Sequence, residues 1–213
     1  MKRLAGSQNT ATVSLKKRKV GEKKNILTYD EVKQNGDSIL KVMNYNIDGL
    51  GIDLLVRTKA CIDIIIKQNA DIVTLQEVIE PTRDLLVHIL TIAGYENKSS
   101  SASKCSYFTM IFIKRKSNLK FLSSSRIPYR KSNSQMGRDI LTAVITIDGM
   151  KVQIVTSHLE STKSHSTTRC KQLKEIFDDY LFAKDVNYPV IFCGDTNLSY
   201  NNSVGMSDER IAL

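Results

Sequence analysis

The sequence predicts an α/β (α+β) protein with mixed sheets, and three observations support this fold class. Apolar runs of strand length alternate with stretches of helical periodicity along the chain. Two β-prone runs flank Asp148-Gly149, a pair typical of tight hairpin turns, so part of the sheet is expected to be antiparallel. The apolar run 190–193 follows a predicted helix and is therefore expected to enter a sheet as a buried strand.

The first half of the chain is expected to alternate strand and helix. The run 39–47 is apolar and β-prone and breaks at Asp48-Gly49, which predicts a first strand. Apolar residues at helical spacing predict a helix over 53–68, and the short apolar run 70–78 predicts a second buried strand. Pro81 favours the start of a helix that ends near Gly94.

The second half adds a strand over 107–113, a hairpin and a final helix and strand. The runs 139–147 and 151–157 are expected to pair through the Asp-Gly turn. An amphipathic pattern over 166–183 predicts a helix that leads into the strand at Val190. No apolar run approaches the roughly 20 residues that a membrane-spanning helix needs, so no membrane partner is expected.

The formal charge of +9 over 213 residues is unevenly distributed. Residues 1–36 hold nine Lys or Arg and three Asp or Glu, have little apolar periodicity, and are expected to form a disordered basic tail. Residues 37–213 are expected to form one domain. Within the tail, a compact basic cluster resembles a nuclear import signal and predicts an import receptor as partner and the nucleus as location, with the cytoplasm as the second compartment. The cluster consists of Lys16, Lys17, Arg18 and Lys19.

A second basic region, residues 114–138, contains eight Lys or Arg side chains and no acidic one. Such a one-signed segment suits the phosphate backbone of a nucleic acid. A solvated loop whose charges are balanced by acids elsewhere in the fold explains the same pattern equally well.

Polar side chains occur at the ends of four predicted strands. Asn46 lies at the end of the first strand and Glu77 at the far end of the second, His158 follows the strand that completes the hairpin, and Asp195 and Asn197 follow the last strand. An amide, carboxylates and a histidine at strand ends are the groups needed for magnesium-assisted hydrolysis of a phosphate ester. The sequence therefore predicts a phosphodiesterase or nuclease site at one edge of the sheets.

These motifs resemble the endonuclease/exonuclease/phosphatase superfamily and, within it, the tyrosyl-DNA phosphodiesterase 2 family. The matching words are Asn-Ile-Asp-Gly-Leu (46–50), Leu-Gln-Glu-Val (75–78), Tyr-Phe-Thr (107–109), Thr-Ser-His-Leu-Glu-Ser-Thr (156–162) and Gly-Asp-Thr-Asn-Leu (194–198). The resemblance implies a DNase I-like fold, a four-layer α/β/β/α sandwich of two mixed sheets. It also implies hydrolysis of the 5′-phosphotyrosyl bond that trapped topoisomerase 2 leaves on DNA, with Mg²⁺ as cofactor and Mn²⁺ as its substitute.

Carried over residue by residue, the resemblance implies roles for the strand-end side chains. Glu77 would hold the metal, and Asn46, His158, Asp195 and Asn197 would order oxygens, stabilise charge and orient water. The implied contacts to the 5′ DNA end come from Tyr107, Ser161 and, as a backbone contact, Arg138. Asp48 and Glu160 are assigned to local hydrogen bonding, because turn and cap roles are common at such positions.

The resemblance ends after Leu198. The family's pattern continues with Arg-Asp and, after further strands, a closing Ser-Asp-His, whereas this chain has Ser199-Tyr200 and stops at Leu213. The sequence thus predicts that the C-terminal part of the fold is missing, with much reduced or absent activity. Two other functions stay open: a different nuclease or phosphatase activity of the same superfamily, and a non-catalytic nuclear DNA-binding fragment.

Overall fold

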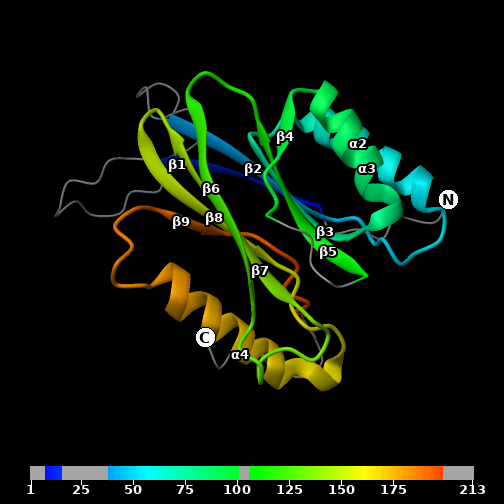
Figure 1. Cartoon of the computed structure of the whole chain (residues 1–213), viewed down its shortest axis with the longest axis vertical. Helices are drawn as coiled ribbons and strands as arrows, with labels where there is room; N and C mark the ends of the chain where they lie inside the picture. Colours follow the sequence, from blue (N-terminus) through cyan, green and yellow to red (C-terminus); the bar gives the residue numbers. More distant parts are fainter. Residues whose placement is uncertain (1–7, 16–37, 101–105, 199–213) are drawn as a thin grey trace, which may run out of the picture.

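The computed structural model describes residues 8–15, 38–100 and 106–198. Two mixed sheets pack face to face, with helices α2 (Leu54–Gln68) and α3 (Glu80–Ile92) on the outer face of one and α4 (Ser166–Ile176) on the outer face of the other (Figure 1). This arrangement confirms the expected α/β/β/α sandwich. No helix in the described part of the chain is long and apolar enough to cross a membrane.

The first sheet has the strand order β1-β2-β3-β5-β4. Its strands are β1 (Gln8–Leu15), β2 (Ser38–Asn46), β3 (Ile72–Ile79), β4 (Tyr95–Asn97) and β5 (Tyr107–Lys114). Helix α2 connects β2 to β3, and these two strands are parallel, as a helical crossover requires. The remaining pairs in this sheet are antiparallel.

The second sheet has the order β6-β7-β8-β9. Its strands are β6 (Leu119–Pro128), β7 (Asp139–Ile147), β8 (Met150–Ser157) and β9 (Val190–Phe192). The predicted hairpin between β7 and β8 is confirmed, and Asp148 and Gly149 both have positive φ, 49° and 76°. Helix α4 continues as a π-helical turn, Phe177–Leu181, before the chain reaches β9 parallel to β8.

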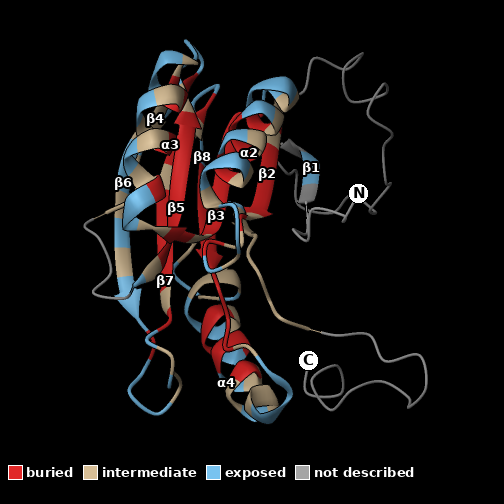
Figure 2. Ribbon diagram, turned by 90° about the vertical axis from the view of Figure 1, so that its right-hand side faces the viewer, coloured by how far each residue is buried: buried red, intermediate tan, exposed pale blue. Residues whose placement is uncertain are grey.

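Apolar side chains fill all three interfaces of the sandwich. Between the sheets, Val42 and Ile72 pack with Leu141 and Ile154. On the outer faces, α2 and α3 cover the first sheet and α4 covers the second, where Leu173 is buried. Figure 2 shows the buried residues concentrated along β2, β3 and β5 and on the inner sides of the helices. Each fully buried Leu or Ile stabilises the fold by about 1.5–3 kcal/mol, so the sandwich is a rigid support for its strand ends.

One segment of the expected tail is ordered. Residues 8–15 form β1, which pairs with β2 from Gln8 opposite Tyr45 to Leu15 opposite Ser38. The expectation of disorder over 1–36 is therefore wrong for this segment. An edge strand can recruit a β-prone stretch through backbone hydrogen bonds alone, without the apolar periodicity on which the prediction relied. The basic cluster 16–19 lies outside the described residues, so its role as an import signal stays a prediction.

Candidate active site

The ends of four strands meet at one end of the sandwich. Asn46 is the last residue of β2, Glu77 lies near the end of β3, His158 directly follows β8, and Asp195 lies just beyond β9. His158 and Asp195 form an isolated parallel bridge that extends the pairing of β8 and β9. The structure therefore brings four of the predicted site residues together, two from each sheet.

Glu77 reaches this cluster because β3 is irregular at this point. The pairing of β3 with β5 shifts register between Leu75 and Val78, and Glu77 has a left-handed φ of 58°. A β-bulge re-aims side chains, and positive φ is uncommon for a residue other than glycine. The bulge turns the Glu77 carboxylate toward Asn46, whose Nδ2 donates to Glu77 Oε1 at 3.1 Å.

Asn46 links the two carboxylates of the site. Its Nδ2 donates to Glu77 Oε1 and, at 2.7 Å, to Asp195 Oδ2. Its Oδ1 accepts a hydrogen bond of 2.8 Å from the backbone N–H of Asp48, which fixes the orientation of the amide. One amide nitrogen thus holds two carboxylates that would otherwise repel each other.

Two glycines allow the loops to approach closely enough. A Cβ at Gly194 would overlap the carbonyl oxygen of Ser157, and a Cβ at Gly49 would overlap that of Glu77. Asp195 N–H donates to the carbonyl of Ser157 at 3.1 Å, which holds the Gly-Asp turn against β8. Any larger residue at these two positions would push the loops apart.

Asn197 supports Asp195 rather than joining the cluster. Its backbone N–H donates to Asp195 Oδ1 at 2.9 Å, and its side-chain Nδ2 donates to the carbonyl of Leu159, also at 2.9 Å. The first contact orients the carboxylate, and the second ties the turn to the segment after His158.

His158 is almost fully buried, with 5% of its surface exposed. Its Nε2 lies 3.8 Å from both Glu77 Oε1 and Asp195 Oδ2. Burial and then the Arg138 guanidinium lower the pKa of His158 to about 4, although Asp195 and Glu160 act in the opposite direction. The imidazole is therefore neutral near pH 7.

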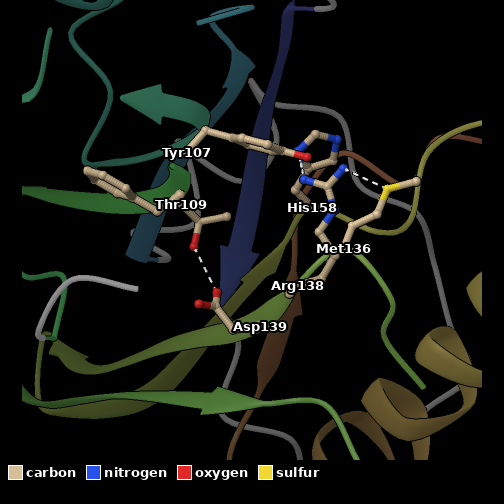
Figure 3. Close-up of a pocket in the computed structure, with 8 residues that line it drawn as sticks. Tyr107, Thr109, Met136, Arg138, Asp139 and His158 are labelled. Carbon is tan, nitrogen blue, oxygen red and sulfur yellow. Dashed lines mark hydrogen bonds between the residues drawn. The ribbon is translucent and has the colours of Figure 1, made fainter. Parts of the chain in front are cut away.

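Arg138 and Tyr107 form the other wall of the site (Figure 3). An Arg138 guanidinium nitrogen lies 2.8 Å from His158 Nδ1, and Arg138 Cζ lies 4.8 Å from the centre of the Tyr107 ring. A small pocket between them is lined also by Met136 and Asp139. Arg138 is 7% exposed and its guanidinium contacts His158, while the expected contact with the DNA stays a prediction.

Ser161 and Glu160, two further residues of the matching motifs, both contact the segment that carries Met136. Ser161 Oγ lies 3.4 Å from Met136 Sδ, an atom of a residue that lines the pocket. The expectation of local hydrogen bonding is wrong for the Glu160 carboxylate, which accepts from the backbone N–H groups of Gln135 and Met136, 25 and 24 positions away in the chain. Burial would raise its pKa, but these bonds and one from Ser134 lower the pKa of Glu160 overall.

Glu77 and Asp195, which Asn46 links, form a carboxylate cluster that suits a magnesium ion. Glu77 and Asp195 are partly exposed, and neither pairs with a Lys or Arg within the described ranges. Those ranges contain no arrangement of three or more His, Cys, Asp or Glu that could hold a metal. Mg²⁺ needs only one or two protein carboxylates, because it keeps waters and shares phosphate oxygens, so the oxygen donors present fit this ion.

In the basic segment 114–138, several charges are balanced by acids elsewhere in the fold, as one of the two expected explanations requires. The segment contains a full strand, β6. Arg126 pairs with Asp139, Lys116 with Asp71, and Arg130 with Asp179. Lys120 and Lys131 are exposed, and no ion pair is formed by either with a described residue.

The sequence is similar to several tyrosyl-DNA phosphodiesterase 2 proteins, although no protein-family model matches it. The Bos taurus protein is 34% identical over 174 residues, covering 78% of this chain and 44% of the relative. The Xenopus tropicalis protein is 36% identical over 176 residues, covering 78% and 43%. The chain thus spans less than half the length of these curated relatives.

Solved structures agree with the sequence comparison. A humanized D. rerio TDP2 carrying 14 mutations gives a TM-score of 0.65 at 34% identity, covering 75% of this chain and 67% of that one. D. rerio TDP2 complexed with single strand DNA product gives 0.66 at 34% identity, covering 76% and 62%. The human Nocturnin catalytic domain, 20% identical with a TM-score of 0.60, shares the fold alone. With its motifs, its two-sheet fold and these relatives in agreement, the chain belongs to the tyrosyl-DNA phosphodiesterase 2 family of the DNase I-like superfamily.

Proposed function

We propose that this chain hydrolyses the phosphodiester bond between a tyrosine side chain and a 5′ DNA end. One observation carries the proposal: a single amide, Asn46, holds the carboxylates of Glu77 and Asp195 together beside the neutral His158. Two carboxylates and a neutral donor suit phosphate-ester hydrolysis. The C. elegans relative, 35% identical over 166 residues, is named a 5′-tyrosyl-DNA phosphodiesterase, which supports this substrate.

The proposed cofactor is Mg²⁺, for which Mn²⁺ would substitute, held by Glu77 with Asp195 close by. Bound there, the ion would neutralise the negative charge that grows on the phosphate oxygens. The exposed fractions of the two carboxylate side chains, 18% and 22%, leave room for water and substrate oxygens. Asn46 keeps the two carboxylates in place before a cation is present.

The protein side chains would share the remaining tasks. Asp195, oriented by Asn46 and by the backbone of Asn197, would accept a proton from the attacking water. His158 would donate from Nε2 to a phosphate oxygen as its charge develops. Tyr107 and Arg138 would contact the 5′ end of the DNA, since they line the pocket beside His158. Ser161, beside Met136, would also contact the DNA.

The proposed biological context is removal of topoisomerase 2 adducts during DNA repair in the nucleus. The support comes from the family of the relatives and from the basic cluster 16–19, which suits a nuclear import receptor. Exposed Lys120 and Lys131 would add sequence-independent attraction to the DNA backbone.

The test is release of tyrosine from a single-stranded oligonucleotide that carries a 5′-phosphotyrosyl group, with Mg²⁺ and with a chelator. The chain should release tyrosine only with Mg²⁺, and Asp195→Ala should abolish release. The matched control is Asp178→Asn, at an exposed acid of the π-helical turn, which should behave as wild type. Faster cleavage of an unmodified oligonucleotide would favour a nuclease instead, and no turnover by the folded chain would contradict the proposal.

A further inference from the structure

Glu160 organises the loop that carries Arg138. Its side chain is fully buried, and its Oε1 accepts three hydrogen bonds from the segment 134–138, the arginine loop. The donors are Ser134 Oγ at 2.9 Å, Gln135 N–H at 2.8 Å and Met136 N–H at 2.9 Å. A buried carboxylate that gathers three donors fixes the path of a loop, because each donor would lose its partner if the loop moved.

A hydrogen-bond relay connects Glu160 to the backbone of Arg138. The N–H of Arg138 donates to Ser134 Oγ at 2.8 Å, and the same hydroxyl donates to Glu160 Oε1. A hydroxyl has one proton to donate and lone pairs to accept with, so both bonds form at once. The position of the Arg138 backbone thus depends on Glu160.

The Arg138 side chain in turn determines which nitrogen of His158 carries the proton. A guanidinium has donors only, so His158 Nδ1, 2.8 Å away, must accept and cannot be protonated. The ring proton is therefore on Nε2, the nitrogen that faces Glu77 and Asp195. In a neutral histidine, the hydrogen bond made by one nitrogen fixes the state of the other.

We infer that Glu160 is a positioning residue: through the arginine loop and Arg138 it holds His158 in the Nε2–H form that faces the carboxylates. The inference rests on the proposed function, since in that reaction the Nε2–H group serves the scissile phosphate. Glu160 touches none of the reacting atoms and acts through two other residues.

Helix α4 anchors Glu160 and also supplies a matched comparison. Glu160 N–H donates to Gln172 Oε1 at 2.9 Å, and Arg169 donates to the carbonyl of Glu160 at 3.0 Å. A second buried carboxylate, Glu175 on α4, holds residues 130–133, which precede the arginine loop. It accepts from Asn133 Nδ2 at 2.7 Å and from Arg130 N–H at 3.1 Å. The contacts of Glu175 thus secure residues 130–133 and leave the arginine loop to Glu160.

The test reads the His158 tautomer directly by two-bond ¹H–¹⁵N correlation spectra of ¹⁵N-histidine-labelled protein. The chain has three histidines, so a His158→Gln spectrum assigns the signal. Wild type should show Nε2 protonated and Nδ1 unprotonated. Glu160→Ala should populate the Nδ1–H form and lower tyrosine release by about 10- to 100-fold, as loss of a supporting hydrogen bond does. Glu160→Gln, whose amide oxygen can still accept, should keep the wild-type tautomer.

Glu175→Gln should also keep the tautomer, because it acts on residues 130–133 rather than on the arginine loop. The inference is overturned if folded Glu160→Ala retains the Nε2–H form, or if Glu175→Gln shifts the tautomer as much. Should Glu160→Ala fail to fold, Ser134→Ala, which removes only the relay hydroxyl, decides the matter by the same spectrum. The spectrum does not depend on turnover: a shifted tautomer with no tyrosine release in wild type would count against the proposed function alone.

Discussion

The carboxylate cluster and the basic segment 114–138 differ in whether their charged side chains form ion pairs. Glu77 and Asp195 lie together with a shared amide and a neutral histidine, and no Lys or Arg pairs with them within the described ranges. In the basic segment, Arg126, Lys116 and Arg130 are each matched by an acid from another part of the fold. In the folded chain, the two carboxylates have no basic partner among the described residues, whereas these three cations are already paired.

The difference shows that charge availability is decided by tertiary partners. The acids that pair with the basic segment lie outside it: Asp71 precedes β3, Asp139 begins β7, and Asp179 follows α4. A segment's net charge therefore says little about what it can bind until its neighbours in space are known. If this is so, substitutions of paired charges should affect stability, and substitutions of unpaired charges should affect function.

The largest effect is expected at the buried ion pair of the basic segment. Arg126 and Asp139, whose side chains are 8% and 11% exposed, lie 2.7 Å apart. Arg126→Met should lower the free energy of unfolding by about 3–5 kcal/mol, because it leaves a buried carboxylate unpaired. Denaturant unfolding measures this, with Arg83→Met, at an exposed pair, as a nearly silent control. An unchanged midpoint for Arg126→Met would show that this cation is not structural.

The next effect concerns catalysis rather than stability. Glu77→Gln should reduce magnesium-dependent tyrosine release by about 100-fold or more, since it removes the charged ligand while preserving shape. Unfolding should change little, because Glu77 pairs with no Lys or Arg in the described fold. Glu96→Gln, at a half-exposed acid of β4, is the control. If Glu77→Gln instead lowered stability strongly and left turnover intact, the carboxylate would be structural rather than functional.

A third prediction uses the pH dependence of stability. Burial, with Arg138 next, lowers the pKa of His158 to about 4, whereas an unfolded histidine titrates near 6.5. The unfolded chain therefore binds this proton more readily between these values. Stability from this group is complete above pH 6.5 and is lost as the pH falls toward 4, by at most about 3 kcal/mol. His158→Gln should flatten that part of the curve, and an equally steep curve in the variant would assign the loss to other groups.

The smallest effect is expected at Lys120 and Lys131, two exposed cations of the basic segment that form no ion pair with a described residue. Lys120→Ser and Lys131→Ser should each weaken binding to single-stranded DNA slightly and reduce the salt slope of log K by about 0.7 for each phosphate that is no longer neutralised. Lys59→Ser, at an exposed position on α2, is the control. A salt slope that stays at the wild-type value in both variants would exclude these two lysines from DNA binding.

The sequence predicted the positions of the strand ends well because each marker is local. Asn46, His158 and Asp195 lie at or just beyond the ends of β-prone runs, and the Asp148-Gly149 turn sets the register of β7 and β8. The sequence contains no local signal for the bulge that turns Glu77 inward, because the bulge arises from the pairing of β3 with β5. The residues next to Glu77 in the sequence include no glycine, which would have indicated a positive φ.

Other features were missed because they depend on partners far along the chain. β6 contains three consecutive serines and two basic residues, so its alternation is weak, and pairing with β7 stabilises it. The contact between Arg138 and His158 joins residues twenty positions apart without a shared motif. β1 was missed because the side chains described for it, Thr10 to Thr12, are exposed and give no sign of the pairing with β2.

The division of the site between the two sheets has a consequence for folding. Asn46 and Asp195, joined by one hydrogen bond, are 149 positions apart in the chain. Contacts of such separation form late, after local structure has appeared. The secondary-structure signal should therefore recover before tyrosine release during refolding, and a compact state with loosely packed sheets should have every site residue but no working centre. Stopped-flow circular dichroism alongside timed activity assays would show this delay, which makes turnover a reporter of sheet docking.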